Sequence, residues 1–275
     1  MNALQGKVAV VLGASAEGGT GWSIAEAFAR AGAKVLVAAR TQEPLVKLAA
    51  RIGGTAVACD AGDEGQVKRL AQTAVRTYGR VHVAVNCAGL PVQGTIAEVT
   101  RQQLQDGVNV NYFGHVWFIK YLAEAIGSDG AIVIISSITS THPDQNFVGY
   151  ACAKAAANCL VRYAALEYGP RNIRINAVLP GPIDSHMARE TFQDPRMRRA
   201  FEREVPLGRI AQPADIADAV LWLAGSAYAT GLDLHVNGGM QLRRMPRLDE
   251  LPGGADSYGE GLPLGDRAPA RGPVE

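Results

Sequence analysis

The sequence predicts a doubly wound α/β fold, in which one parallel sheet carries helices on both faces within a single domain. Short apolar runs alternate with helical patterns along most of the chain, and these runs are apolar at nearly every position rather than at every second one. Strands of that kind belong to parallel sheets that are covered on both sides. The length of 275 residues suits one large domain of this class.

The expected strands are short runs rich in valine, isoleucine and alanine, and the first of them reads KVAVVL. They cover 7–12, 34–39, 55–60, 81–89, 131–137, 173–181 and 232–239. Between them, apolar residues three and four positions apart indicate helices. These helices cover 22–33, 64–79, 101–126, 148–169 and 215–225.

Composition excludes several classes of partner. The net charge is +1, from 27 basic and 26 acidic residues, so nothing favours nucleic acid or an anionic membrane surface. The start MNALQGKVAVV is too short and too weakly apolar for a signal peptide, and no apolar run reaches the roughly 20 residues of a membrane span. We therefore expect a cytoplasmic protein. The cysteines and histidines show no metal-ligand spacing, so we expect no metal.

The chain divides into a domain over 1–240 and a tail over 241–275. The tail is rich in glycine and proline and shows no helical or strand period, so we expect a flexible or extended segment. The alternative is that it packs on a neighbouring subunit and helps to close a pocket. Within the domain, 185–205 is expected to form a lid over the substrate, with the basic run RMRRAFER as a solvated helix.

A glycine-rich turn follows the first expected strand directly. It reads GASAEGGTG over 13–21 and leads into the helix expected at 22–33. Free N–H groups and the helix dipole make such a helix start an anion site, and glycine lets a phosphate approach the backbone. In the first strand–helix unit of a parallel sheet, this pattern indicates a dinucleotide site. Other polar stretches follow the remaining strands, at the edge where parallel sheets bind ligands.

Over residues 5–240 the sequence resembles the classical short-chain dehydrogenase/reductase family, of the ketoreductase type. The motifs that carry the resemblance are, in order, GASAEGGTG (13–21), CDAGD (59–63), NCAG (86–89), NVNYFG (109–114), ISS (135–137), YACAK (150–154), PGPIDS (180–185) and PLGRIAQPADIADAVLWLA (206–224). The resemblance implies a Rossmann fold, a nicotinamide cofactor, and hydride transfer between that cofactor and a ketone or secondary alcohol.

Two features depart from the family pattern. The turn between Gly13 and Gly19 is two residues longer than usual, a length similar to that of the enoyl-acyl carrier protein reductases. Those enzymes separate their tyrosine and lysine by six residues, whereas YACAK separates them by three, so we expect carbonyl and alcohol chemistry. Cys87 replaces the second asparagine of the usual NNAG turn and is expected to pack as a small apolar side chain, while Asn86 ties neighbouring strands together.

Tyr150 and Lys154 lie four positions apart on an expected helix and so share one face. An ammonium near a phenol lowers the pKa of the phenol, which would make Tyr150 a proton donor or acceptor at neutral pH. The resemblance implies in addition that Lys154 holds the ribose hydroxyls of the cofactor.

The resemblance adds two residues to the catalytic set. Ser137, at the end of a strand, is expected to orient the substrate oxygen as charge develops on it. Its neighbour Ser136 should point to the other face of the strand. Asn111 is expected to hold a water of the proton relay, and the Tyr-x-Gly that follows favours it over Asn109.

The choice of nicotinamide depends on the end of the second strand, VAARTQE. Family members that prefer NAD place an acid there, whereas this chain has Ala39 and Arg40, whose guanidinium suits a 2′-phosphate. We therefore favour NADP(H) over NAD(H). Asp60 is expected to accept from the adenine amino group, with Ala61 beside it. The other cofactor-binding residues implied are Gly13, Ser15, Gly19, Thr20, Gly21, Asn86, Ala88, Gly89, Tyr150, Lys154, Pro180, Gly181, Ile183 and Ser185.

We therefore predict an NADP(H)-dependent carbonyl reductase or alcohol dehydrogenase that acts on a small-molecule substrate. The sequence does not identify this substrate. One alternative is an NAD-dependent alcohol dehydrogenase of the same fold. Another is a nucleotide-binding regulatory protein without turnover, against which the complete catalytic set argues. The resemblance also implies a homo-oligomer, a tetramer or a dimer, built through the long helices at about 101–126 and 150–168.

Overall fold

A parallel sheet of seven strands, in the order β3-β2-β1-β4-β5-β6-β7, forms the centre of the computed structural model. The structure describes residues 4–185 and 188–253. The strands are β1 (Val8–Leu12), β2 (Lys34–Ala39), β3 (Thr55–Ala58), β4 (Val83–Asn86), β5 (Gly130–Ile135), β6 (Ile173–Pro180) and β7 (Asp233–Val236). Each adjacent pair is parallel. The predicted fold class is confirmed.

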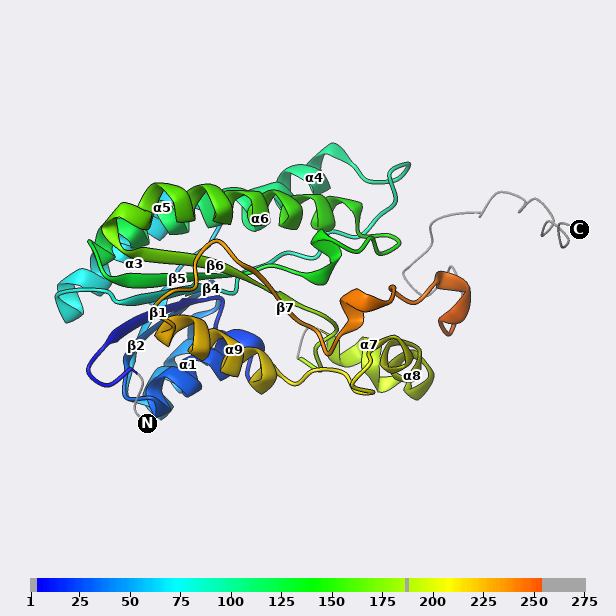
Figure 1. Cartoon of the computed structure of the whole chain (residues 1–275), viewed down its shortest axis with the longest axis horizontal. Coiled ribbons are helices and arrows are strands. Elements are labelled where there is room, and N and C mark those ends of the chain that lie inside the picture. Colours follow the sequence, from blue (N-terminus) through cyan, green and yellow to red (C-terminus); the bar gives the residue numbers. More distant parts are fainter. Residues whose placement is uncertain (1–3, 186–187, 254–275) are drawn as a thin grey trace, which may run out of the picture.

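Helices cover both faces of this sheet (Figure 1). On one face, α1 (Thr20–Arg30), α2 (Gln42–Ile52) and α9 (Pro213–Gly225) close one apolar core against the strands. On the other face, α3 (Glu64–Tyr78), α5 (Gly114–Ile126) and α6 (Val148–Tyr168) close a second core. Helix α2 was not among the helices predicted from the sequence. Its Pro44 lies in the first turn, where a missing N–H costs little, and Leu45 and Leu48 are fully buried.

The helix expected over 101–126 is interrupted. It consists of α4 (Arg101–Val108), a π-helical turn (Asn109–Phe113) and α5. Thr100 and Gln103 form a reciprocal capping box at its start. A π turn adds one residue to the helical repeat and occurs frequently at functional sites. Here it brings Asn111 to a fully buried position beside the sheet.

The strand order reverses between β1 and β4, and this is the point at which doubly wound sheets bind ligands. Strand β4 is shorter than expected and ends at Asn86. The Asn86 Oδ1 atom accepts a hydrogen bond from the backbone N–H of Ala88 at 2.9 Å, which turns the chain out of the sheet. The glycine turn 13–21 follows β1 directly, so both turns lie at the same edge.

We call residues 185–205 the lid, after the role that the sequence predicts for them; residues 186–187 lie outside the described ranges. The lid contains α7 (Arg189–Gln193) and α8 (Pro195–Glu204). Asp194 caps α8 by accepting from the N–H of Arg196 at 2.8 Å. A small apolar cluster joins these helices to Ile138 after β5 and to Met240 after β7.

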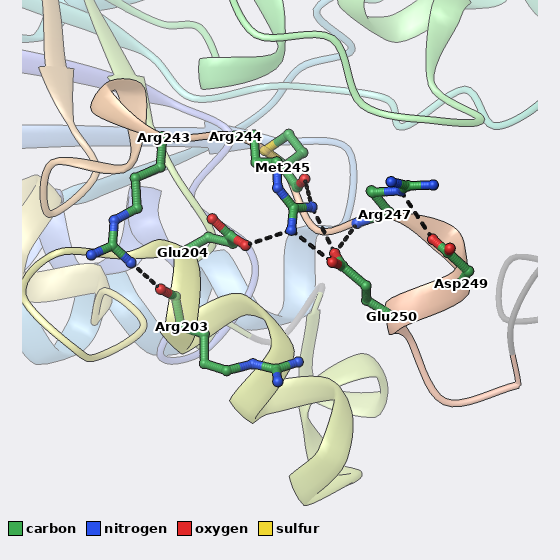
Figure 2. A network of polar contacts seen from close by, with 8 residues as sticks. All are labelled: Arg203, Glu204, Arg243, Arg244, Met245, Arg247, Asp249 and Glu250. Carbon is green, nitrogen blue, oxygen red and sulfur yellow. Dashed lines mark hydrogen bonds and ion pairs between the residues drawn. The ribbon is translucent and has the colours of Figure 1, made fainter. Parts of the chain in front are cut away.

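Residues 240–253, which we call the C-terminal strap, pack against the lid. Met245 and Leu251 join the apolar cluster of the lid. Figure 2 shows Arg244 between two carboxylates, 3.2 Å from Glu204 of α8 and 2.6 Å from Glu250 of the strap. The flexible tail expected from 241 onward is therefore wrong for 241–253, because apolar and ionic contacts with the lid hold these residues. Residues 254–275 lie outside the described ranges.

Candidate active site

A long cleft follows the carboxyl ends of the strands. At one end it is lined by residues that follow β1, β2 and β3, among them Ser15, Arg40, Asp60 and Ala61. At the other end it is lined by the start of α1 and by residues that follow β5 and β6, among them Ser137, Tyr150, Lys154 and Ser185. Gly13 and Gly89 line both ends, so the two parts meet at the switch point.

Two glycines of the turn pack too closely against neighbouring backbone to carry a side chain. Gly13 has a φ of +89°, and a Cβ on it would lie 2.5 Å from the backbone nitrogen of Ala88. A Cβ on Gly21 would lie 2.3 Å from the carbonyl oxygen of Gly13. Bare backbone therefore borders the cleft at the start of α1. This arrangement fits the pyrophosphate of a dinucleotide, because helix N-termini with free N–H groups bind phosphate.

Arg40 and Asp60 mark the end of the cleft away from Ser137, Tyr150 and Lys154. Arg40 is exposed immediately after β2, and both residues line the cleft. The Oδ1 atom of Asp60 accepts from the N–H of Gly62 at 2.9 Å, which fixes the carboxylate in the turn after β3. A guanidinium and an oriented carboxylate thus border the same part of the cleft.

Tyr150 and Lys154 both project from α6 into the other end of the cleft. Lys154 is 2% exposed, and its Nζ atom donates to the carbonyl oxygen of Ile135 at 2.8 Å. Burial lowers the pKa of Lys154 to about 8. The ammonium lies 5.6 Å from the ring centroid of Tyr150, so the shared face expected from their spacing is present.

Burial is the main influence on the pKa of Tyr150 in this structure. Burial raises the pKa of Tyr150 to about 12, and the Ser137 hydroxyl is the group that opposes this by lowering it. The Lys154 Nζ atom is directed to the Ile135 carbonyl oxygen. The effect of Lys154 on the pKa of Tyr150 stays a prediction.

Ser137 follows β5 and caps a short 3₁₀ turn, Ile138–Ser140. Its Oγ atom accepts from the N–H of Thr139 at 3.2 Å and from the Thr139 hydroxyl at 2.9 Å. Ser136, the preceding residue, is 3% exposed, and its hydroxyl donates to the carbonyl oxygen of Lys154 at 3.4 Å. The two serines therefore have separate partners, and Ser137 faces Tyr150.

Asn111 is fully buried and does not line the cleft as Tyr150 does. Its amide brackets Leu90, accepting from the N–H at 3.0 Å and donating to the carbonyl oxygen at 2.8 Å. A Cβ on Gly89 would lie 3.5 Å from the Asn111 Oδ1 atom and 3.7 Å from the Lys154 Nζ atom. The Asn111 Oδ1 and Lys154 Nζ atoms thus lie on the same side of Gly89, where a side chain would otherwise stand.

Asn86 is also buried rather than exposed to the cleft. Its Nδ2 atom lies 2.9 Å from the Nδ1 atom of His115 on α5, while its Oδ1 atom is held by Ala88. The Ala88 contact orients the amide, so the Nδ1 atom of His115 accepts and the neutral ring carries its proton on Nε2. Burial, and secondarily the charge of Lys154, lower the pKa of His115 well below its usual value.

The sequence does not mark His115 as a functional residue, because an isolated histidine in an apolar helix has no distinctive spacing. Thr139 was missed as well, since nothing in its spacing distinguishes it from the other hydroxyl residues of its loop. Cys87 borders both ends of the cleft, and burial raises the pKa of its thiol to about 12. This fits the inert small side chain expected at that position.

The remaining predicted residues lie along the cleft. Asn86 and Asn111 are buried and do not line the cleft. The predicted residues not yet placed line one end of the cleft or the other, and they are Gly19, Thr20, Gly21, Ala88, Pro180, Gly181 and Ile183. Among the described residues, no group of three or more histidine, cysteine or acidic side chains could hold a metal ion. Within the same ranges, no helix is long and apolar enough to span a membrane.

Comparison with known proteins gives consistent matches along most of the chain. A family model described as "Enoyl-(Acyl carrier protein) reductase" matches residues 13–241. The 3beta-hydroxysteroid dehydrogenase 1 of Eggerthella lenta is 33% identical over 87% of this chain and 95% of its own length. The 7alpha-hydroxysteroid dehydrogenase of Clostridium sardiniense is 36% identical, over 88% and 96%. Glucose 1-dehydrogenase of Gluconobacter oxydans is 32% identical, over 86% and 92%.

The fold has close structural counterparts. A short-chain type dehydrogenase/reductase from Mycobacterium ulcerans superposes with a TM-score of 0.85 at 26% identity. The match covers 90% of this chain and 94% of that structure.

Proposed function

Because the chain belongs to the short-chain dehydrogenase/reductase family, whose relatives here are oxidoreductases of alcohols and ketones, we propose that it is an NADP(H)-dependent carbonyl reductase or alcohol dehydrogenase of the cytoplasm. The observation that carries the proposal is the meeting of Ser137, Tyr150 and Lys154 at one end of a cleft that presents Arg40 at the other. The family uses a nicotinamide cofactor, and the cleft is lined from the residues after β2 and β3 to those after β5 and β6.

In this proposal Tyr150 transfers a proton to the substrate oxygen during reduction and removes it during oxidation. Ser137 donates a hydrogen bond to that oxygen, on which negative charge develops. Lys154 holds the ribose hydroxyls, and Asn111, on the same side of Gly89 as Lys154, connects Lys154 to the proton relay. The bound cofactor supplies or accepts the hydride.

Three parts of the cleft are assigned to the cofactor. The turn 13–21 binds the pyrophosphate, since its glycines leave the backbone bare. Arg40 binds the 2′-phosphate of NADP(H), and Asp60 accepts from the adenine amino group. Pro180, Gly181, Ile183 and Ser185 border the nicotinamide end, with the Ile183 backbone at the carboxamide.

We assign α7 and α8 to a lid over the substrate, held in place by the strap. We also propose a homo-oligomer, a tetramer or a dimer, built on the outer face of α5 and α6. Support comes from apolar side chains that the single chain leaves exposed there, with Phe113 45%, Tyr163 64% and Leu166 77% exposed.

The test is oxidation of NADPH, and separately of NADH, with a panel of aliphatic, aryl and cyclic ketones and of sugar and steroid carbonyls. We expect turnover with NADPH that falls by at least about 100-fold in Tyr150→Phe, because a positioned proton donor contributes that much or more. Turnover with NADH alone would overturn the assignment of NADP(H). Nucleotide binding without turnover on any carbonyl or alcohol would favour the non-catalytic alternative.

A paired substitution isolates the role of Arg40. We expect Arg40→Leu to raise KM for NADPH by at least about 10-fold and to leave KM for NADH nearly unchanged, because only the former carries the extra phosphate. Arg76→Leu is the matched control, since Arg76 is an exposed arginine of α3 that donates to the Thr73 hydroxyl away from the cleft. Equal effects of Arg40→Leu on both nucleotides would contradict the assignment.

A further inference from the structure

The hydroxyl of Ser137 is held by a second hydroxyl that the family resemblance does not assign. Thr139 donates to the Ser137 Oγ atom twice, from its backbone N–H at 3.2 Å and from its own Oγ1 at 2.9 Å. A serine hydroxyl has two acceptor lone pairs and one proton to donate. Both acceptor positions are therefore filled by Thr139.

With its acceptor positions filled, the Ser137 hydroxyl can act only as a donor, and its proton must point away from Thr139. Tyr150 lines the same end of the cleft as Ser137, and the Ser137 hydroxyl lowers the pKa of Tyr150. A hydroxyl that accepts hydrogen bonds also becomes a stronger donor, because chains of hydrogen bonds polarise one another. Thr139 thus prepares Ser137 to donate to an oxygen that gains negative charge.

The backbone of this turn is fixed independently of Thr139. The Ser140 hydroxyl donates to the carbonyl oxygen of Ser137 at 2.6 Å, and Asn158 of α6 donates to the Ser140 Oγ atom at 2.8 Å. Ile138 is 2% exposed and anchors the turn in the apolar cluster of the lid. Because other residues hold the backbone, the Thr139 hydroxyl is free to act on the Ser137 side chain alone.

We propose that Thr139 is a positioning residue for the reaction: its hydroxyl locks Ser137 as a hydrogen-bond donor toward Tyr150 and the substrate oxygen. The inference rests on the proposed function for its effect on turnover. It also predicts a property that can be measured without turnover, because Thr139 donates to Ser137 and the Ser137 hydroxyl lowers the pKa of Tyr150.

Thr139→Val is the direct test, since valine keeps the β-branched shape and removes the hydroxyl. We expect kcat for carbonyl reduction to fall about 3- to 10-fold with the dissociation constant for the nucleotide unchanged, the size of effect of one net hydrogen bond. Thr139→Ser, which keeps the hydroxyl, should restore most of the activity. Thr141→Val is the matched control, because the Thr141 hydroxyl of the same loop donates to the carbonyl oxygen of Ile138.

The pH profile separates positioning from a structural role. A hydrogen bond from Ser137 favours the phenolate of Tyr150, so a weaker donor leaves the pKa of Tyr150 higher. In Thr139→Val the limb of the pH profile that reports Tyr150 should therefore move to higher pH, in reduction and in oxidation alike. An unchanged profile, or the same loss in Thr139→Ser as in Thr139→Val, would overturn the proposal.

A readout without turnover keeps the two proposals apart. With tyrosine labelled by ¹³C at Cζ, the resonance of Tyr150 is the one missing from Tyr150→Phe. It should shift in Thr139→Val and stay in place in Thr141→Val. A protein that shows this shift but reduces no carbonyl would retain the Thr139 inference and lose the proposed function. A resonance that does not move in Thr139→Val would overturn the inference whatever the activity.

Discussion

Two regions of the molecule, one in the cleft and one packed on the lid, use charge in opposite ways. In the wall of the cleft formed by Ser137, Tyr150 and Lys154, the Lys154 ammonium is 2% exposed and has the Ile135 carbonyl as its hydrogen-bond acceptor. In the strap, the Arg244 side chain is 48% exposed and contacts the carboxylates of Glu204 and Glu250. The first charge is desolvated without a counter-charge, and the second is hydrated and paired.

The difference shows which charged group costs the fold stability and gains a pKa suited to proton transfer. Removing an ammonium from water without pairing it disfavours the charged form and moves its pKa toward neutrality. Such a group destabilises the fold but can hold and pass a proton. An exposed ion pair stays charged and hydrated. It joins two segments of the chain but adds little to the free energy of unfolding. The following predictions test this contrast, from the largest expected effect to the smallest.

Lys154→Met should abolish activity and stabilise the protein. Activity should fall at least about 100-fold, since the proton relay loses a member. The pKa of Lys154 is lowered from 10.5 to about 8, so below pH 8 the folded state carries a charge that its surroundings disfavour. Removing that charge should raise the free energy of unfolding at neutral pH by roughly 1–3 kcal/mol, less the cost of the unpaired Ile135 carbonyl.

Urea unfolding of both proteins between pH 7 and pH 10 gives the check. Between about pH 8 and 10.5 the unfolded wild type binds more protons than the folded protein at Lys154, so its stability rises with pH. The advantage of Lys154→Met should therefore shrink across this interval. A variant less stable than wild type at pH 7, with a gap independent of pH, would contradict the desolvated charge.

His115→Leu tests the contact between His115 and the buried side-chain amide of Asn86. The substitution leaves the Asn86 Nδ2 atom buried and unpaired, so the free energy of unfolding at pH 7.5 should fall by roughly 1–3 kcal/mol. Nucleotide affinity should weaken a few-fold, because Asn86 holds the turn that carries Ala88 and Gly89.

The pH dependence of this effect has a defined sign. The folded pKa of His115 is lowered well below 6.5, so below that pH the unfolded chain takes up a proton that the folded protein does not. The wild type should lose about 1.4 kcal/mol per pH unit there from this residue, and His115→Leu should not. The stability gap should therefore narrow from pH 7.5 to pH 5.5 in denaturant titrations. A constant gap would show that His115 does not remain neutral in the fold.

Arg244→Gln should have the smallest effect. It removes the cation between Glu204 of α8 and Glu250 of the strap, so we expect faster proteolysis within 241–253 and a change in kcat of less than about threefold. Arg247→Gln is the control, because Arg247 pairs with Asp249 inside the strap at 3.2 Å. A large loss of activity in Arg244→Gln alone would make the strap part of the catalytic machinery and erase the contrast with the wall.

Much of the fold and the outline of the site could be predicted from residues close together in the sequence. Continuous apolar runs predicted the parallel sheet, and the spacing of Tyr150 and Lys154 predicted their common face. The glycine turn predicted a site of bare backbone, because positive φ and close approach at Gly13 are local requirements. Helix α2 was missed although its signals are local, and the interruption at Asn109–Phe113 was missed because a π turn leaves no distinct pattern in the sequence.

What the sequence determined by itself is the set of groups available for chemistry and the edge of the sheet that holds them, since both follow from local periodicity and turn residues. Only the tertiary structure decided their state. The pKa values of Tyr150 and Lys154 depend on burial by distant elements. The contacts of His115 with Asn86 and of Arg244 with Glu204 join residues far apart in the chain, as does the packing of the strap on the lid. Desolvation and long-range contacts arise only when the chain is folded.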